Sequence, residues 1–208
     1  MENGLGLLII YFEEIMKKTL LSIALLSTFG AASAEQLSYD FVQVAAIQTE
    51  FADIVGFKAK GFEVKGSYEF YPNVFTEVTY FSADDTANDI KFDVDQWQVK
   101  AGYIQRLSSN TALDYSLGYG KIEFDYRKGE LRAGDETNYY SLNTSIRHML
   151  VEDVEVYAGL GIQKWKKGSD QKYYTLGSQY TFGDFVAGAS YTKFSDSEVF
   201  AITGRYTF

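Results

Sequence analysis

The last eight residues, AITGRYTF (201–208), decide the fold. Ile202, Tyr206 and Phe208 share one parity, and polar residues fall between them. Alternation with period 2 is typical of a β-strand with one apolar face. A soluble sandwich would bury that face, whereas a membrane barrel turns it to lipid and turns the polar face, here Arg205, to a lumen. The rest of the chain distinguishes between these two classes.

The segment Met16–Ala34, MKKTLLSIALLSTFGAASA, has the three parts of a secretory signal peptide. Two lysines open it, an apolar stretch follows, and a small-x-small site closes it. Cleavage between Ala34 and Glu35 is therefore predicted. Residues 1–15 are superfluous to such a signal and indicate an over-extended gene start; a longer leader or an uncleaved anchor is the alternative. The mature barrel domain is expected over residues 35–208.

The composition narrows the class of protein further. The chain has 19 Lys and Arg against 28 Asp and Glu, and this acidic balance argues against nucleic acid as a partner. It has no Cys, which excludes a disulfide framework, a thiolate metal site and a lipidated Cys. With 17 Tyr, 16 Phe and a single Pro, the composition favours an all-β protein.

Ten segments of the mature chain alternate with period 2, and each is about as long as a tilted strand that crosses a membrane. Tight turns and longer links alternate between them; the longest links are residues 123–136, 49–59 and 83–92. This pattern predicts a closed antiparallel up-and-down transmembrane β-barrel with short periplasmic turns and longer outer loops. The expected strands are 37–47, 59–71, 74–83, 93–106, 111–122, 137–148, 154–165, 172–182, 185–194 and 198–208.

The signal segment, hairpin units such as GSYEFYPNVFTEVTY and the terminal GRYTF resemble the small bacterial outer-membrane β-barrels of the OmpA/OmpX-like group. The resemblance implies the outer membrane of a Gram-negative bacterium. It also implies that Phe200, Tyr206 and Phe208 form a signal read by the barrel-assembly machinery. Well-known members have eight strands, so eight is the alternative to ten. The group has no shared catalytic motif, so the resemblance supplies no catalytic residue and no cofactor.

The inward parity carries acids and bases together, and these are the candidate site residues. Charges inside a narrow barrel must be paired and hydrogen-bonded. The pattern therefore predicts a lumen mostly plugged by ion pairs; a narrow ion path is the alternative. The predicted lumen charge network is Glu63, Lys65, Glu69, Glu77, Lys100, Arg106, Asp114, Arg147, Glu155 and Arg205.

Two further features are candidate sites. The single His148 falls on the outward parity beside a short turn, so an interfacial His is favoured over a general base, and the chain is not expected to be an enzyme. Asp84, Asp85 and Asp89, with two more Asp before residue 96, could chelate Ca²⁺, but their spacing fits no EF-hand loop. A solvated acidic loop is favoured, and no metal is expected.

The sequence thus predicts a monomeric outer-membrane barrel with a structural or surface-interaction role through acidic outer loops. Its expected partners are membrane lipid, the assembly machinery and a surface ligand whose identity the sequence does not give. A small porin-like channel is the alternative. A soluble periplasmic barrel of lipocalin type is disfavoured, because the inward parity is polar.

Overall fold

The computed structural model describes residues 37–51, 58–87 and 89–208. The predicted cleavage site at Ala34 and Glu35, and the predicted gene start before Met16, lie outside these residues. Within the described part of the chain, no helix is long and apolar enough to cross a membrane.

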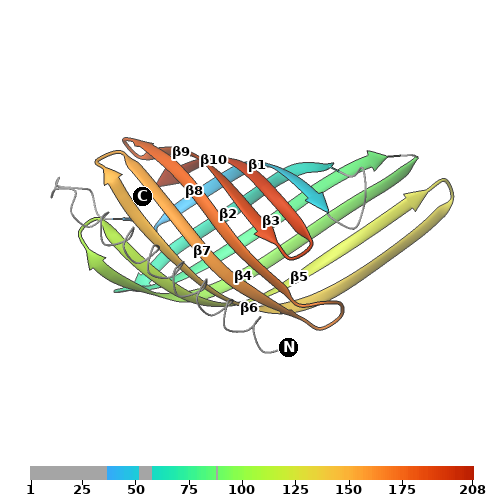
Figure 1. Cartoon of the computed structure of the whole chain (residues 1–208), viewed down its shortest axis with the longest axis horizontal. Helices are drawn as coiled ribbons and strands as arrows, with labels where there is room; N and C mark the ends of the chain where they lie inside the picture. The colour runs from blue at the N-terminus through green and yellow to red at the C-terminus, as the bar shows by residue number, and fades with distance from the viewer. Residues whose placement is uncertain (1–36, 52–57, 88) are drawn as a thin grey trace, which may run out of the picture. The chain divides into compact units, whose positions relative to one another are not determined.

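Ten antiparallel strands close into a single barrel over the described residues (Figure 1). Each strand pairs with the next along the chain, and β1 pairs with β10 from Phe41 opposite Thr207 to Phe51 opposite Ser197. Where the strands pair on both sides, closure leaves no sheet edge and the ladder satisfies the backbone polar groups; residues 131–138 of β6 pair with β5 alone. The predicted ten-stranded all-β barrel is confirmed. The strands are β1 Phe41–Phe51, β2 Lys58–Tyr71, β3 Val74–Ala87, β4 Ile90–Ser108, β5 Thr111–Lys128, β6 Leu131–Val151, β7 Val154–Trp165, β8 Gln171–Phe182, β9 Phe185–Phe194 and β10 Ser197–Thr207.

The two ends of the barrel differ. We call the end with the carboxy terminus and the turns at 72–73, 109–110, 152–153 and 183–184 the near end. The opposite end, with the connections after β1, β3, β5, β7 and β9, is the far end. Asn73 and Gly183 adopt positive φ angles of 65° and 66° in two of the near-end turns, which Asn and Gly tolerate well. The near-end turns are short, as predicted.

The far-end connections are shorter than predicted, because the strands continue through them. Of the predicted link 123–136, all but the turn at 129–130 is strand, and Lys128 pairs with Leu131. The link 83–92 is likewise mostly strand, with Ala87 opposite Ile90. As a result β4, β5 and β6 have 19, 18 and 21 residues. The β5–β6 hairpin, yellow in Figure 1, reaches furthest from the carboxy terminus.

The outer surface of the barrel carries a band of exposed apolar side chains between two rings of aromatic residues. Within the band, Leu160, Leu117 and Val44 are more than half exposed. Aromatic side chains mark the near-end edge, where Phe185 contacts both Phe182 and Tyr206. The far-end edge is a second aromatic ring, which we call the far ring: Phe62, Tyr80, Trp97, Tyr119, Tyr140, Tyr174, Tyr191 and Phe200.

Beyond the far ring, the polarity of the wall inverts. In β4 the outward parity carries Trp97 and Val99 within the band, but Asp93 and Asp95 beyond the ring. The inward parity changes the other way, from Lys100 in the middle of the barrel to buried Phe92 and Val94 towards the far end. Other strands repeat the outward change; on β5 it runs from Leu117 to Glu123. The barrel is therefore apolar outside over one zone and apolar inside over the next.

Candidate functional site: the lumen

The lumen has three layers, each lined by inward side chains. An apolar cluster lies at its near end and consists of Leu37, Tyr39, Phe75, Ile104, Ala112 and Met149, all buried. Charged and amide side chains fill the middle. A second apolar cluster lines the far end: Ala45, Ile47, Ala59, Ala83, Phe92, Val94 and Ile122.

A buried ion pair joins the neighbouring strands β6 and β7 next to the near-end cluster. Arg147 on β6 donates from Nε to Glu155 Oε1 at 2.7 Å and from Nη2 to Oε2 at 2.8 Å. Glu155 also accepts a hydrogen bond of 2.6 Å from Gln179 Nε2. The remaining Arg147 nitrogen, Nη1, donates to the Ser38 carbonyl at 2.9 Å, and the guanidinium lies 4.7 Å from the ring centre of Tyr39. The segment before β1 is thus tied into the lumen by Arg147.

Asp114 is held by hydroxyl groups. It accepts hydrogen bonds from Tyr39 Oη at 3.0 Å and from Ser145 Oγ at 2.5 Å. No Lys or Arg among the described residues lies within ion-pair distance of it. Tyr39 therefore bridges Arg147 and Asp114, and joins the two polar groups at the near end.

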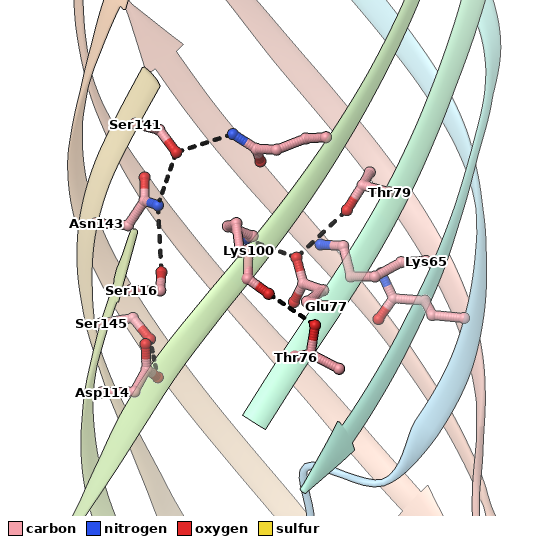
Figure 2. A network of polar contacts seen from close by, with 12 residues as sticks. Lys65, Thr76, Glu77, Thr79, Lys100, Asp114, Ser116, Ser141, Asn143 and Ser145 are labelled. Carbon is pink, nitrogen blue, oxygen red and sulfur yellow. Dashed lines mark hydrogen bonds and ion pairs between the residues drawn. The ribbon is translucent and has the colours of Figure 1, made fainter. Parts of the chain in front are cut away.

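The middle layer contains two ion pairs, one between β3 and β4 and one within β2; the residues of the first, Glu77 and Lys100, are shown in Figure 2. Lys100 Nζ lies 2.6 Å from Glu77 Oε1, which also accepts a hydrogen bond from Thr79 at 3.3 Å. Lys65 Nζ lies 3.4 Å from Glu63 Oε1. Each lysine of this layer therefore has a carboxylate partner from a neighbouring or the same strand.

Amides and hydroxyls continue the polar layer across to β5 and β6 (Figure 2). Ser141 Oγ accepts hydrogen bonds from Gln98 Nε2 at 3.0 Å and from Asn143 Nδ2 at 3.3 Å. Asn143 Nδ2 also donates to Ser116 Oγ at 3.2 Å, and Asn143 Oδ1 accepts a hydrogen bond from Tyr173. The middle of the lumen is therefore crossed by hydrogen bonds as well as by ion pairs.

The predicted lumen charge network divides into separate groups. All ten predicted residues lie on the inward face, but they do not form one network. Glu69 pairs with Arg106 at 2.7 Å near the near-end rim. Arg205 has no carboxylate within ion-pair distance among the described residues; it donates twice to Gln43 Oε1 and stacks 3.9 Å from the ring centre of Phe41.

Sequence reasoning missed the neutral partners of these charges. Tyr39 falls inside the predicted strand 37–47 on the parity not expected to face the lumen, whereas in the structure it precedes β1, which begins at Phe41. Gln179 lies on the expected inward parity, and that parity is the available signal for it. Gln43 lies on the opposite parity from Asp40, which was expected to face inward, so no signal in the sequence identifies it.

Several inward glycines have an aromatic ring over them, so they do not widen the lumen. A Cβ on Gly177 would lie 2.2 Å from the ring of Tyr157, and one on Gly161 would lie 2.4 Å from the ring of Tyr173. These approaches are possible because Gly has no side chain. The glycines of the inward parity thus make room for tyrosine rings that cross the lumen.

Two cavities lie within the lumen. The smaller one, of about 190 Å³, lies among Arg147, Arg205, Asp114 and the middle ion pairs. The larger one, which we call the far cavity, has a volume of about 740 Å³ and reaches from the middle layer to Ser197 and Ala133 at the far-end rim. Both are lined by Lys65, Glu77 and Lys100, which therefore form the layer between them.

The other predicted features lie away from this cavity system. His148 is on the outward parity near the near-end turn, and its Nδ1 lies 2.9 Å from Thr111 Oγ1. Among the described residues, no group of three or more His, Asp or Glu side chains is placed to hold a metal ion. Phe200, Tyr206 and Phe208 lie on the outward face, about half exposed or more.

No protein-family model and no curated protein sequence matches the chain. Among solved structures, the β domain of the Bordetella autotransporter BrkA is similar, with 12% identity, a TM-score of 0.51, and coverage of 81% of this chain and 98% of that chain. The translocator domain of the autotransporter NalP from Neisseria meningitidis has 11% identity, a TM-score of 0.47, and coverage of 95% and 96%. The attachment invasion locus protein Ail of Yersinia pestis has 18% identity, a TM-score of 0.40, and coverage of 80% and 94%.

At these sequence identities the similarity shows the fold alone. Of these three structures, the BrkA β domain is the one with a TM-score above 0.5, so the similarity of fold rests on it. The predicted resemblance to outer-membrane β-barrels is confirmed at the level of the fold.

Proposed function

We propose that this chain is an outer-membrane β-barrel with a structural or surface-interaction role, and that its lumen is closed to solutes at the periplasmic end. The observation that carries the membrane assignment is the inversion of polarity at the far ring. A soluble barrel would bury its apolar residues inside throughout its length. Here the band that contains Leu117, Val99 and Leu160 faces outward, between two aromatic rings of the kind that mark membrane interfaces.

The same inversion supports an orientation. The near end has the short turns and the chain terminus, which in bacterial outer-membrane barrels lie on the periplasmic side. The far end would then stand outside the cell, with its apolar residues turned inward and its charges turned to water. Several outward charges there are paired; Lys121 lies 2.6 Å from both Glu123 and Glu136.

Closure of the lumen is supported by the layers at the near end. The Arg147–Glu155 pair, Tyr39 and the apolar cluster around Ile104 occupy the section that a solute would have to cross. Charges in such a layer are each held by two or more contacts, so displacing one leaves a buried partner without compensation. The far-end surface, including acidic Asp84 and Asp93, would then carry any interaction with an external partner.

The alternative is a small porin-like channel. The observation that favours it is that the two cavities share part of their lining, including Lys65, Glu77 and Lys100, so side-chain movement in this layer would join them. Only the near-end layer would then separate the lumen from the periplasm.

Single-channel recording of the refolded chain in planar bilayers separates these functions. A closed barrel predicts little or no conductance for wild type. The variant Arg147→Ala should introduce a leak, because it removes the side chain that holds Glu155 and Ser38. The matched control is Arg127→Ala, since Arg127 lies beyond the far ring and is exposed. Steady, cation-selective wild-type channels would reject closure and favour the porin-like function.

A further inference from the structure

The far cavity has an aromatic lining that neither the ion pairs of the lumen nor the near-end layer requires. We infer that it is a binding site for an uncharged small molecule with an apolar, ring-containing body and at least one hydrogen-bond donor. Its volume of about 740 Å³ lies within the range of small-molecule sites, which is roughly 300–1,000 Å³. The inference rests on the barrel of the proposed function, but it does not depend on closure of the lumen at the near end.

The walls of the cavity supply the apolar contact surface. Phe92 lies at the centre of an aromatic cluster, with ring centres 5.4 Å from Phe51, 6.0 Å from Phe124 and 4.8 Å from Tyr126. Trp165 extends the cluster, stacked 6.4 Å from Phe124. Aromatic side chains bury a large area and favour offset or edge contacts with other rings. This wall suits a flat, apolar ligand.

The charges that border the cavity already have polar partners, which are counter-ions for the lysines and the amide of Gln171 for Asp196, and this argues against a charged ligand. On the floor, Lys100 and Lys65 have Glu77 and Glu63 as partners. At the rim, Asp135 lies 2.9 Å from Lys167 Nζ, and this hydrogen bond lowers the pKa of Asp135. A charged ligand would have to leave water and break one of these pairs to gain a counter-ion.

Two neutral polar atoms in the wall have no hydrogen-bond partner among the described residues. They are Thr49 Oγ1 and Gln171 Oε1, and both side chains are more than nine-tenths buried. Gln171 cannot turn freely, since its Nε2 donates to Asp196 Oδ2 at 2.6 Å. Its Oε1 is therefore fixed as an acceptor that lacks a donor. A buried acceptor without a donor is costly, so a ligand O–H or N–H placed there would be favoured.

Binding can be tested with N-phenyl-1-naphthylamine, which is uncharged, has two ring systems and carries one N–H. Its charged counterpart is 8-anilinonaphthalene-1-sulfonate. The chain has two Trp, so Trp97→Phe leaves Trp165 in the cavity wall as the sole donor for energy transfer to the probe. The full chain in lipid nanodiscs should show a saturable transfer signal above the non-saturable signal of probe dissolved in lipid. The sulfonate should show no saturable component.

Two variants in the same background locate the probe. Ala201 lines the far cavity, so Ala201→Phe should remove the saturable component. Ala187 is exposed on the outward face, so Ala187→Phe should leave that component unchanged. Gln171→Leu should weaken binding by about threefold to tenfold, the effect of one neutral hydrogen bond. Heat-modifiable migration on gels checks that each variant is folded.

The inference is overturned if folded Trp97→Phe protein gives no saturable component, or if Ala201→Phe and Ala187→Phe bind the probe equally. Equal binding of the sulfonate would overturn the uncharged class. Conductance measurements report on the near-end layer, so failure of the closed-lumen function and failure of this site are distinguishable.

Discussion

Arg147 and Glu155 face each other across the β6–β7 hairpin through two parallel hydrogen bonds, of 2.7 and 2.8 Å. The geometry is the bidentate one that a guanidinium and a carboxylate favour. Because Arg147 also holds the Ser38 carbonyl, the pair links the hairpin to the segment that precedes β1.

Breaking this pair should destabilise the barrel. Arg147→Ala leaves Glu155 buried without its counter-ion, and we expect the free energy of unfolding to fall by about 3–5 kcal/mol. Replacing both residues by Met should restore most of that loss. Urea unfolding in lipid vesicles, followed by tryptophan fluorescence, measures both. Lys58→Ala, at an exposed pair with Glu50, is the control and should change little. A double variant as unstable as Arg147→Ala would contradict the expectation.

Because the apolar band faces outward, the outer and inner faces of the barrel wall should differ in how well they tolerate an arginine. Leu160→Arg should cost about 2–4 kcal/mol of unfolding free energy, because Leu160 lies within the apolar band. Ser190→Arg places the same side chain in the far cavity, where polar groups and space are available, and should cost less. Vesicle unfolding titrations compare them directly. Equal losses would mean that the assigned faces are wrong.

The glycine–tyrosine contacts predict a second asymmetry. Gly177→Ala forces the ring of Tyr157 to move and should destabilise the barrel by about 1–3 kcal/mol, the usual cost of overpacking. Gly204→Ala is the matched control, since a Cβ there meets nothing within 4 Å. If the two variants have the same unfolding midpoint, the ring contacts contribute nothing measurable to stability.

The terminal aromatics predict a defect in cells that is absent in purified protein. Phe208 is exposed on the outward face, so Phe208→Ala removes little packing. If the residue is read during assembly, the amount of heat-modifiable barrel in the outer membrane should fall, while refolding of the purified variant into vesicles should match wild type. Equal assembly in cells would remove Phe208 from the predicted signal.

The predicted signal peptide gives a prediction that does not depend on the barrel structure. Mass spectrometry of the membrane-inserted protein should find Glu35 as the first residue. Ala34→Arg should leave the leader attached, because a small residue is required before the cleaved bond. A wild-type mass that still contains Met16 to Ala34 would refute the predicted site.

Period-2 alternation was sufficient to predict the strand number, the outward face and the near-end turns, because each strand keeps one parity apolar within the band. It failed for the far half of β4 and β5. In the stretch IKFDVDQWQVKAGY the apolar residues are even-numbered up to Val94 and odd-numbered from Trp97. That change of phase lies inside the predicted strand 93–106, and only the residues before it, 83–92, are predicted as a loop.

This change of phase in the sequence marks the place where the polarity of the barrel wall inverts. Single-sequence reasoning that expects apolar residues to face outward cannot assign Phe92 or Phe124 to the lumen. The partners of the lumen charges were also out of reach, because they depend on which strands lie opposite each other across the barrel. Tyr39 and Asp114, for example, are 75 residues apart.

The seam between β1 and β10 has a consequence for biogenesis. It joins the first and last strands along their whole length, so no shortened chain can make it. Until Phe208 has been synthesised and delivered, any partly paired sheet has two free edges and an apolar surface. The free edges of such a species would pair with strands of other chains as readily as with its own strands. If the chain is an outer-membrane protein, as proposed, it must cross the periplasm before its sheet forms, and its two end strands first pair at the membrane.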